Sequence, residues 1–484
     1  MRTGKGMSEL DVLVVGGGIS GLAIAHCLTR SGLTVEVWES DTRVGGKIDT
    51  VVKQGYRLES AASMVVNFRS EVDQFLLTAG LQASKRARAS HAKRYVLDAD
   101  RLCELPSGLR DMLGLSLFSR FGKLRLLAEP LVPRGWNPHE SVTEFVTRRL
   151  GKEFLEKIFE PYVAGLLASD VDLAEARATM PRLTALEERY GSLALGAILK
   201  KVCRRGNGAR PDVFSFRGGM ATLVETLARE GGFRVRRDLR VSQVWPVSNG
   251  WMASGVMGDS SRATFSKQLI LSTPADAAAS LVDHLDAELA RLLRTIEYAP
   301  VNVVHTGFDR TTITHPLNGS GFLVPRCSGF APNGCLWMSK LFPDHAPEGQ
   351  VLLSTYLGGA RDPAAANWDA TRTLDTVMHM LRVLLGIKVG PEMLHIVSHA
   401  RALPLYHGAY SQRLAAIDRR LAALPGLYLE ANYKGGVSVR DRILRADLMA
   451  TRILRHRNSV LSNNTRARVP AGMQDMTPAS ATIR

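Results

Sequence analysis

The sequence has few cysteines and few aromatic residues for its length, and long apolar runs are scarce. Only 6% of its 484 residues are aromatic, and its five cysteines are far apart, with no C-x-x-C pair. This spacing argues against a disulfide framework and a zinc site, so we expect no metal and a reducing compartment. The first nine residues are too short and polar for a secretory signal, and no transmembrane helix is predicted.

Acidic residues are also fewer than basic ones, 46 against 62, which gives a formal net charge of +16. The sequence shows no zinc finger, no helix-turn-helix spacing and no basic stretch interleaved with aromatic residues, so we expect no nucleic-acid partner. The excess arginines are spread along the chain. Two interpretations remain open: an ordinary solvated basic surface, or attraction to an anionic membrane face or an acidic substrate.

A glycine-rich turn lies within residues 12–40, VLVVGGGISGLAIAHCLTRSGLTVEVWES. An apolar strand leads into the pattern G-x-G-x-x-G, a helix follows, and a second apolar strand ends at an acidic residue. Strand, turn, helix, strand and acid within about 30 residues form the fingerprint of a dinucleotide-binding unit. The sequence therefore predicts a Rossmann-type cofactor domain.

Each position of this fingerprint has an expected role. Gly16 permits a tight turn, Gly18 lets the backbone approach a pyrophosphate, and Gly21 lets the helix pack on the strand. The start of the helix offers free N–H groups to phosphates, and the acid at the end of the second strand accepts hydrogen bonds from a ribose. The other residues expected at the dinucleotide are Ile19, Ser20, Glu39 and Ser40.

The segment that follows distinguishes between cofactors. Arg43, Gly45, Gly46 and Lys47 resemble the R-x-G-G-[RK] element of FAD-containing amine-oxidase-type flavoproteins. Adjacent glycines after a basic residue let the backbone pass close to a phosphate or the ribityl chain. We therefore expect FAD, bound non-covalently, rather than NAD.

Three separated segments are expected to build the FAD-binding domain: residues 8–85, 210–275 and 405–457. The second contains a strand in which Val241 is predicted to contact the adenine side through its backbone. The third contains a glycine pair followed by a long helix, whose first N–H groups would point at the pyrimidine edge of the flavin. The residues expected there are Gly436, Val437 and Ser438.

Two inserted segments separate these pieces. Residues 86–205 are predicted to be helical, and between residues 81 and 135 the chain has eleven Lys and Arg against five Asp and Glu. This composition fits a helix on a membrane surface, or an amphipathic helix that faces the core. Residues 276–404 read as short strands that would form a sheet under the substrate cavity. Residues 458–484 are expected to be a flexible tail.

Several stretches of the chain resemble the protoporphyrinogen oxidase family of amine-oxidase-like flavoproteins. They include ELPSGLRDML, the run EPYVAGLLASDVDLAEARATMPRLTALEERYGSL from Glu160 to Leu193, GFLVP, LFPDHAPEGQVLLSTYLGG and PGLYLEANYKGGVSVRDRI. The resemblance implies an α/β fold. Its parts would be a Rossmann-type FAD domain of the p-cresol methylhydroxylase/amine-oxidase kind, an α+β substrate domain and a helical, membrane-associated insertion.

The resemblance also implies residues that contact the substrate. Arg110 matches an arginine placed near a substrate propionate, while Leu323 and Phe342 match apolar residues that hold the rings of a macrocycle. The chain departs from the family pattern after Glu59, where Ser60, Ala61 and Ala62 replace the expected glycine and proline. Tyr433 and Lys434, before the second glycine pair, are a further departure.

The implied function is FAD-dependent dehydrogenation of a porphyrinogen, protoporphyrinogen IX to protoporphyrin IX, in haem biosynthesis with dioxygen as acceptor. No catalytic acid or base is assigned. One alternative is an amine-oxidase-like dehydrogenase of an amine or secondary metabolite, with Tyr406, Tyr410 and Tyr433 near the flavin. The other is a flavin-binding protein without turnover. We expect a cytoplasmic protein; peripheral attachment to the inner membrane face and a homodimer remain open.

Overall fold

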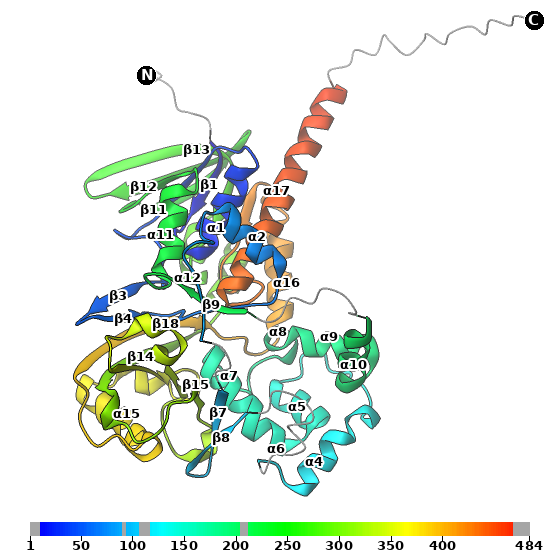
Figure 1. Cartoon of the computed structure of the whole chain (residues 1–484). Helices are drawn as coiled ribbons and strands as arrows, with labels where there is room; N and C mark the ends of the chain where they lie inside the picture. Colours follow the sequence, from blue (N-terminus) through cyan, green and yellow to red (C-terminus); the bar gives the residue numbers. More distant parts are fainter. Residues whose placement is uncertain (1–9, 90–92, 106–116, 204–211, 468–484) are drawn as a thin grey trace, which may run out of the picture.

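The computed structural model describes residues 10–89, 93–105, 117–203 and 212–467. Two large sheets stand one above the other, and a layer of helices lies beside the lower sheet (Figure 1). The fold is mixed α/β, in agreement with the sequence.

The first sheet has seven strands and contains both the beginning and the end of the described chain. Strand β13 is central, because β1 pairs with it in parallel on one side, and β12 and β19 pair with its two halves on the other. The strands are, in spatial order, β10 (Arg234–Arg236), β2 (Val35–Trp38), β1 (Leu10–Val15), β13 (Ser260–Leu271), β12 (Gly250–Met257) and β11 (Arg240–Val247), with β19 (Leu427–Leu429) beside the end of β13.

Helices cover both faces of this sheet, which explains why β1 is apolar at nearly every position. Val12 and Val14 join the core on one face, and Leu13 and Val15 join the core on the other. The helices of the first face are α1 (Ile19–Arg30), α2 (Ser70–Thr78), α11 (Ala221–Glu230) and α17 (Val439–Ala467). Those of the second face are α12 (Ala275–Val282), α13 (Ala287–Arg294) and α16 (Tyr410–Leu421).

The second sheet also has seven strands and is mainly antiparallel. Helix α15 (Ala370–Leu385) packs on one of its faces. Its strands are, in spatial order, β18 (Met393–Pro404), β14 (Tyr298–Asp309), β17 (Gln350–Gly358), β16 (Gly334–Trp337), β15 (Gly319–Leu323), β7 (Lys93–Asp98) and β8 (Arg101–Glu104). Strands β7 and β8 belong to the range expected to be helical, whereas α12 and α13, within the range 276–404, pack on the first sheet.

Small sheets and short helices connect the two large sheets. A hairpin of β3 (Thr50–Lys53) and β4 (Tyr56–Glu59) lies between them, and β9 (Asp212–Phe216) pairs with both β5 (Val65–Asn67) and β6 (Lys85–Ala87). The short helices are α14 (Met338–Leu341) and the 3-10 turns η3 (Arg310–Thr312), η4 (Arg326–Ser328), η5 (Pro343–His345) and η6 (Pro363–Asn367).

The helical layer packs against β7 of the second sheet through an apolar core. Its elements are α4 (Arg120–Leu127), η1 (Glu129–Leu131), α5 (Val142–Leu150), α6 (Lys152–Phe154), the π-helical turn η2 (Leu155–Phe159), α7 (Glu160–Leu167), α8 (Ala176–Thr179), α9 (Pro181–Tyr190) and α10 (Leu193–Cys203). Within the described ranges, no helix is both long and apolar enough to cross a membrane.

One fully buried arginine links the helices of this layer. Arg149 on α5 forms ion pairs with Glu187 on α9 and Glu129 on η1, and it also donates to the carbonyl of Gly191. Glu129 in turn accepts the first N–H groups of α10 at Leu193, 2.8 Å away. Because each buried charge has a partner, the network fixes the relative positions of α5, α9 and α10.

Candidate cofactor and substrate site

The glycine-rich turn has the geometry that the sequence predicts. Gly16 has φ of +108°, and a Cβ at this position would lie 2.7 Å from the carbonyl oxygen of Ser272. A Cβ on Gly21 would lie 2.0 Å from the carbonyl oxygen of Gly16, so α1 packs on the strand more closely than any side chain allows. Gly18 instead faces open space, with no atom within 4 Å of where a Cβ would be. A ligand can therefore approach the backbone at Gly18.

Glu39 lies beside this turn, at the end of β2. One carboxylate oxygen accepts the N–H of Gly17 at 2.6 Å, and the other accepts the N–H of Asp41 at 2.9 Å and the hydroxyl of Ser40 at 3.2 Å. The side chain is 7% exposed. A fixed, partly accessible carboxylate beside the turn suits a ribose hydroxyl.

Val241 lies on the same side as Glu39. The N–H of Glu39 donates to Arg236 at 2.8 Å, and the N–H of Leu239 donates to the carbonyl of Glu39 at 2.9 Å. Val241 follows two residues later in β11, where the pairing with β12 is irregular. The strand thus continues from the side of the turn where Glu39 lies, and an adenine contact at Val241 stays a prediction.

The second glycine pair lies directly against the first turn. The N–H of Gly45 donates to Gly17 at 2.8 Å, and a Cβ on Gly46 would be 3.6 Å from the Cα of Gly18. Arg43 holds this loop through backbone carbonyls, donating to Gly46 at 2.7 Å and to Ile48 at 3.2 Å. Its guanidinium therefore shapes the loop rather than pointing freely at a phosphate.

Lys47 extends from the same loop toward the second sheet. Its ammonium donates to the carbonyl of Ala402 on β18 at 2.7 Å and lies 5.4 Å from the ring centre of Tyr298. Burial lowers the pKa of this ammonium to about 8. Lys47 was expected at the cofactor; in the structure it connects the cofactor segment to β18.

Unpaired polar atoms beside the turn indicate that the residues present fit a dinucleotide. The hydroxyl oxygens of Ser272 and Thr273, which follow β13, are buried and have no hydrogen-bond partner among the described residues. Buried hydroxyls are normally satisfied, so these two are available to a ligand. Together with the open face of Gly18 and the first N–H groups of α1, they form a cradle for phosphates.

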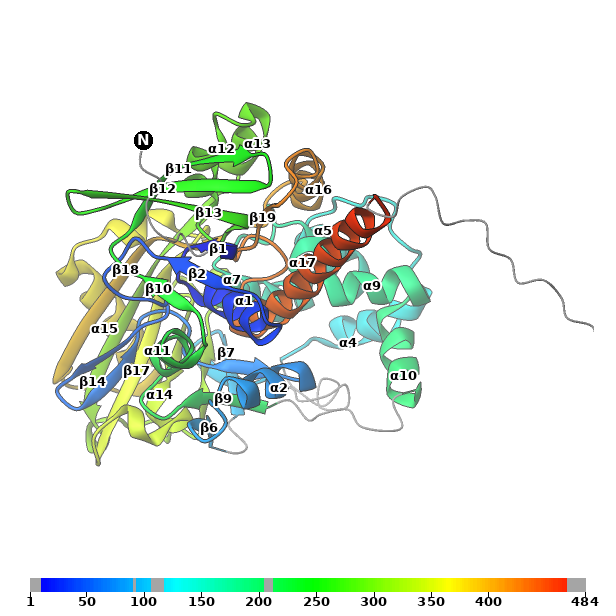
Figure 2. The same cartoon turned by 90° about the horizontal axis from the view of Figure 1, so that it is seen from above.

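A second helix begins at the same edge of the sheet. Helices α1 and α17 follow the parallel strands β1 and β19, so both start at the carboxyl edge, and they pack side by side (Figure 2). Ser438 precedes α17, accepts the N–H of Asp441 at 3.2 Å and donates to its carboxylate at 2.6 Å. Gly436, with φ of +107°, brings the chain into this start. Two helix N-termini therefore face the region between the sheets.

Glu59 is buried between the two sheets. It accepts the N–H of Met220 at 3.0 Å and the hydroxyl of Thr50 at 2.9 Å, and His345 Nε2 lies 3.8 Å from it. Burial raises the pKa of Glu59 to about 8 and lowers that of His345. At neutral pH both groups are therefore uncharged. Met220 and His345 are far from Glu59 along the chain, so no local sequence pattern indicates these contacts.

The segment after Glu59, which departs from the family pattern, is attached to the second sheet. The carbonyl of Ser60 lies 2.7 Å from His399 Nε2, and the hydroxyl of Ser63 lies 2.9 Å from that of Tyr356. These contacts fix residues 59–63 at the joint between the cofactor and substrate parts of the molecule.

The residues expected at the substrate are not gathered in one cluster. Leu323 on β15 packs against the helical layer, where a Cβ on Gly165 would be 2.5 Å from its side chain. Phe342, only 2% exposed, packs beside Tyr56 of β4, and its ring centre lies 5.5 Å from that of His345. Arg110 lies outside the described residues.

The three tyrosines of the amine-oxidase alternative do meet. The ring centres of Tyr406 and Tyr410 are 4.9 Å apart, and the hydroxyl of Tyr410 donates to the carbonyl of Tyr433 at 2.8 Å. All three belong to the core beneath α12 and α16. Their cluster is therefore part of the packing of the first sheet.

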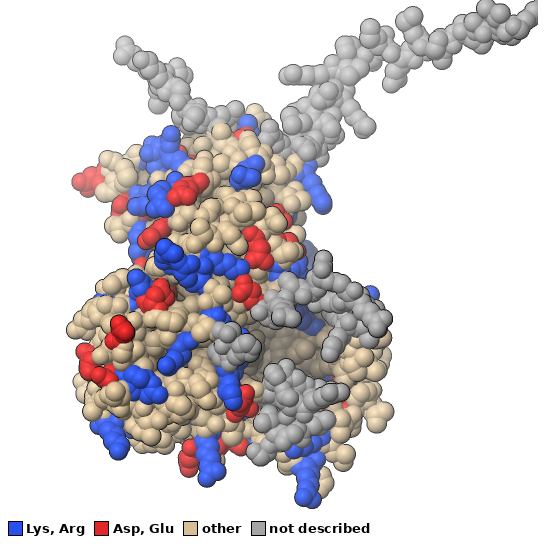
Figure 3. All heavy atoms as spheres, viewed as in Figure 1, with Lys and Arg blue, Asp and Glu red and all other residues tan. Residues whose placement is uncertain are grey.

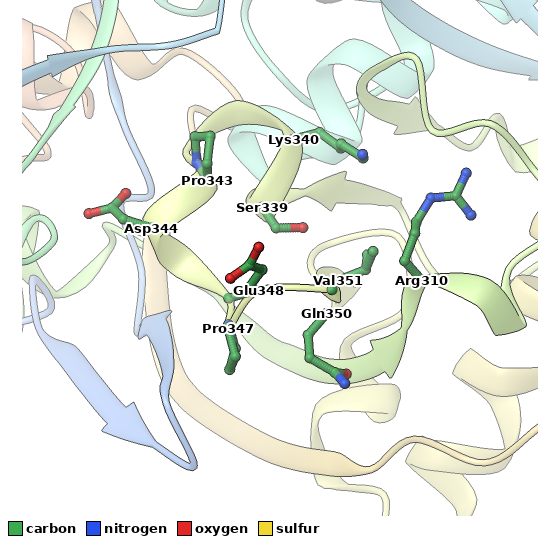
Figure 4. Close-up of a pocket in the computed structure, with 11 residues that line it drawn as sticks. Arg310, Ser339, Lys340, Pro343, Asp344, Pro347, Glu348, Gln350 and Val351 are labelled. Carbon is green, nitrogen blue, oxygen red and sulfur yellow. The ribbon is translucent and has the colours of Figure 1, made fainter.

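A separate hollow lies in the second sheet, away from the glycine turns. Its volume is about 530 Å³, and Figure 4 shows Arg310 and Lys340 at one side of it and Asp344 at the other. The guanidinium of Arg310 is occupied by the carbonyls of Ile313 and His315. None of the residues expected at the cofactor lines this hollow.

The chain is similar to known flavoproteins along most of its length. The family model described as flavin containing amine oxidoreductase matches residues 19–453. The mitochondrial protoporphyrinogen oxidase of Nicotiana tabacum is 30% identical over 96% of this chain and 98% of its own length. The coproporphyrinogen III oxidase of Bacillus subtilis is 28% identical over 89% and 95%, respectively.

Solved structures show the same fold. A protein from Exiguobacterium sp. 255-15, provisionally described as a protoporphyrinogen oxidase, superposes with a TM-score of 0.75 at 23% identity and covers 93% of this chain and 99% of its own. The chain therefore belongs to the flavin-containing amine oxidoreductases, and it is an FAD-dependent oxidoreductase. Within that family its curated relatives include protoporphyrinogen and coproporphyrinogen oxidases, which confirms the resemblance drawn from the sequence.

Proposed function

We propose that this protein is an FAD-dependent oxidase that dehydrogenates a porphyrinogen in haem biosynthesis, with protoporphyrinogen IX as substrate, protoporphyrin IX as product and dioxygen as acceptor. One observation carries the proposal: relatives with these activities in their names align over almost the whole chain, the first over 96% of it. The glycine turn, the fixed carboxylate of Glu39 and the two helix starts at the same sheet edge support it.

Bound FAD supplies the acceptor for a hydride from a saturated bridging carbon of the substrate. The chain holds the cofactor without a covalent bond, through the backbone at Gly18, the carboxylate of Glu39 and the N-terminus of α1. The N-terminus of α17, at Ser438, favours negative charge beside it. These residues bind and orient; the pyrrole nitrogens of the substrate release the proton.

Glu59 is not assigned as a catalytic base. Glu59 is the buried carboxyl between the sheets, and its pKa of about 8 keeps it protonated at neutral pH. Its carboxyl is held by the N–H of Met220 and the hydroxyl of Thr50. This agrees with a reaction in which the substrate itself stabilises the cation that forms.

The test is reduction of the flavin in the absence of dioxygen. Protoporphyrinogen IX, coproporphyrinogen III and putrescine are added separately to the purified yellow protein, and the visible absorbance of the flavin is recorded. We expect bleaching by a porphyrinogen, recovery on admitting air, and porphyrin fluorescence as product. Bleaching by the amine alone would establish the amine-oxidase alternative, and no bleaching by any of the three would favour a flavin-binding protein without turnover.

We also propose that the helical layer docks on an anionic membrane surface, at the inner face of the cytoplasmic membrane. Phe121, Leu131 and Trp136 are 85%, 85% and 95% exposed, and they lie on α4 and in the segment after it. Arg120 and Arg134 are exposed among them. Apolar side chains interleaved with cations suit the interface of an anionic bilayer. On the face shown in Figure 3, Lys and Arg are interspersed with Asp and Glu.

A further inference from the structure

Two arginines from different parts of the molecule stack on one phenylalanine. The Cζ atom of Arg182, on α9 of the helical layer, lies 3.9 Å from the ring centre of Phe68. The Cζ atom of Arg440, in the first turn of α17, lies 4.3 Å from the same centre. Two guanidinium groups this close to one ring centre must occupy its opposite faces. Phe68 therefore lies between two cations, at the junction of the cofactor part and the helical layer.

Hydrogen bonds of Asn67 hold the loop that carries Phe68 in place. Asn67, at the end of β5, is 2% exposed; it accepts the N–H of Arg69 at 2.9 Å and donates to Asp73 at 3.2 Å. The ring is thus presented by a turn with satisfied polar groups. Because β5 is anchored by its pairing with β9, the stacking platform is rigid.

The two arginines differ in how their charge is balanced. The guanidinium of Arg440 donates twice to the carboxylate of Asp441, at 2.8 and 3.0 Å, and once to the carbonyl of Val66 at 3.0 Å. Arg182 has no carboxylate within ion-pair distance among the described residues. Burial lowers the pKa of Arg182, and the nearby charge of Arg440 lowers it further. Arg182 is exposed, with the charge of Asp441 nearby, so its guanidinium is available to an anionic ligand.

The position of Arg182 relates it to the cofactor. Its partner Arg440 follows Ser438 by two residues, and Ser438 is the residue expected at the pyrimidine edge of the flavin. One helical turn spans about 5 Å, so the Phe68 platform lies within about one turn of the α17 start that is proposed to face the flavin. A guanidinium held flat on a ring keeps its N–H fork free at the edge, and that fork matches a carboxylate.

We propose that Arg182, stacked on Phe68, binds a carboxylate side chain of the substrate and orients the macrocycle beside the flavin. The inference rests on the proposed function, because porphyrinogens carry carboxylate side chains, and it assigns the recognition of one of them to a residue of the helical layer. Arg182 is a substrate-binding residue here; Arg440 and Phe68 are positioning residues. A substrate with an additional carboxylate is attracted more strongly to the two cations beside Phe68, Arg182 and Arg440.

The first test is the kinetics of Arg182→Gln. Hydrogen bonds to charged groups contribute about 1.5–3 kcal/mol, so KM for the porphyrinogen is expected to rise roughly 10- to 150-fold while kcat changes little. Arg182→Lys keeps the charge but loses the planar fork, and an intermediate KM is expected. Arg229→Gln is the control: it removes the same charge from an exposed arginine on α11, paired only with Glu230.

The second test is binding without turnover, which separates the inference from the proposed function. Coproporphyrin III has four carboxylates and protoporphyrin IX has two; binding of each to the FAD-loaded protein is followed by fluorescence quenching at several salt concentrations. We expect Arg182→Gln to weaken both, and Phe68→Leu to weaken them less, with unchanged flavin absorbance. If the wild-type protein oxidises no porphyrinogen, the proposed function fails while this binding comparison still decides the role of Arg182.

Unchanged KM and unchanged porphyrin affinity in Arg182→Gln, within twofold of the Arg229→Gln control, would overturn the proposal. A loss of flavin or of folding in Arg182→Gln would contradict it as well, because Arg182 would then be structural. The Phe68→Leu variant checks this separately, since it removes the platform and leaves both cations in place.

Discussion

The substitution Gly18→Ala tests the cofactor site by adding one methyl group to the glycine turn. A Cβ added there meets no atom within 4 Å, and φ is −72°, so Gly18→Ala is expected to leave the fold of the apoprotein unchanged. If the pyrophosphate approaches the backbone at this point, the added methyl blocks it. We expect FAD to bind at least tenfold more weakly, measured by fluorescence titration of the apoprotein.

Gly390 provides the matched control for this substitution. It also has open space at the Cβ position and no positive φ, but it lies in the loop before β18, away from the turn. Gly390→Ala is expected to bind FAD like the wild type. Equal FAD affinity in the two alanine variants would show that the phosphates do not pass Gly18.

The raised pKa of Glu59 predicts that the stability of the folded protein depends on pH. Its carboxyl keeps a proton up to about pH 8 in the folded protein, whereas in the unfolded chain it loses that proton near pH 4.3. Between these values the folded state binds more protons, so this group makes the protein less stable as pH rises. Glu59→Gln removes the titration, and its Tm relative to the wild type is therefore expected to increase from pH 5 to pH 8. A constant Tm difference across that range would show that Glu59 is ionised in the folded protein.

Residues close in sequence were predicted well, and contacts between distant segments were not. The glycine turn, Glu39 and the loop at Gly45 lie within 30 residues of each other, and spacing alone carries their geometry. Lys47 belongs to the same motif, yet its long side chain reaches Ala402, a contact set by how the second sheet packs. The platform at Phe68 joins three segments and left no pattern in the sequence.

At the scale of secondary-structure elements, the helical layer depends on Arg149. Without it Glu129 would keep only hydrogen bonds to the start of α10 and Glu187 would keep only Arg148 as a cationic partner, and breaking a buried ion pair costs about 3–5 kcal/mol. We expect Arg149→Ala to lower Tm markedly and to raise hydrogen exchange in α9 and α10 more than in β13. Arg120→Ala, an exposed change in the same layer, is the control and is expected to change stability by less than about 0.5 kcal/mol. If Arg149→Ala and Arg120→Ala change Tm and hydrogen exchange by similar amounts, losing the Arg149 charge does not destabilise the helical layer.

The short strands predicted for residues 276–404 account for only part of that range. Helices α12 and α13 also fall there, and both pack on the first sheet, not on the sheet formed by most of residues 276–404. The reason is physical: β13 ends directly before α12, so the chain stays on that sheet until β14 begins. A sequence pattern shows that a helix has an apolar face and does not show which sheet will cover it.

The whole molecule is expected to bind vesicles through the helical layer. Burying a large apolar side chain contributes about 1.5–3 kcal/mol, so Phe121→Ser with Trp136→Ser should weaken binding to anionic vesicles by at least tenfold in a sedimentation assay. Binding should also weaken as salt is added, because charge attraction is screened. Val52→Ser, at an exposed apolar position of β3, is the control. If the wild type, the Phe121→Ser/Trp136→Ser variant and Val52→Ser bind vesicles equally, these exposed apolar residues do not dock on the membrane.

The shared strand β13 has a consequence for how the protein is made. Its neighbours β1 and β19 come from the first and last parts of the described chain, and the helix start at Ser438 follows β19. A ribosome therefore releases the glycine turn more than 400 residues before the second half of the cradle exists. Domains generally fold as they emerge, but here the end of β13, at Leu269–Leu271, stays unpaired on one side until β19 has been made. We therefore expect the FAD site to be completed only after β19 and the start of α17 have been made, and a chain truncated before residue 427 to bind FAD more weakly than the full chain.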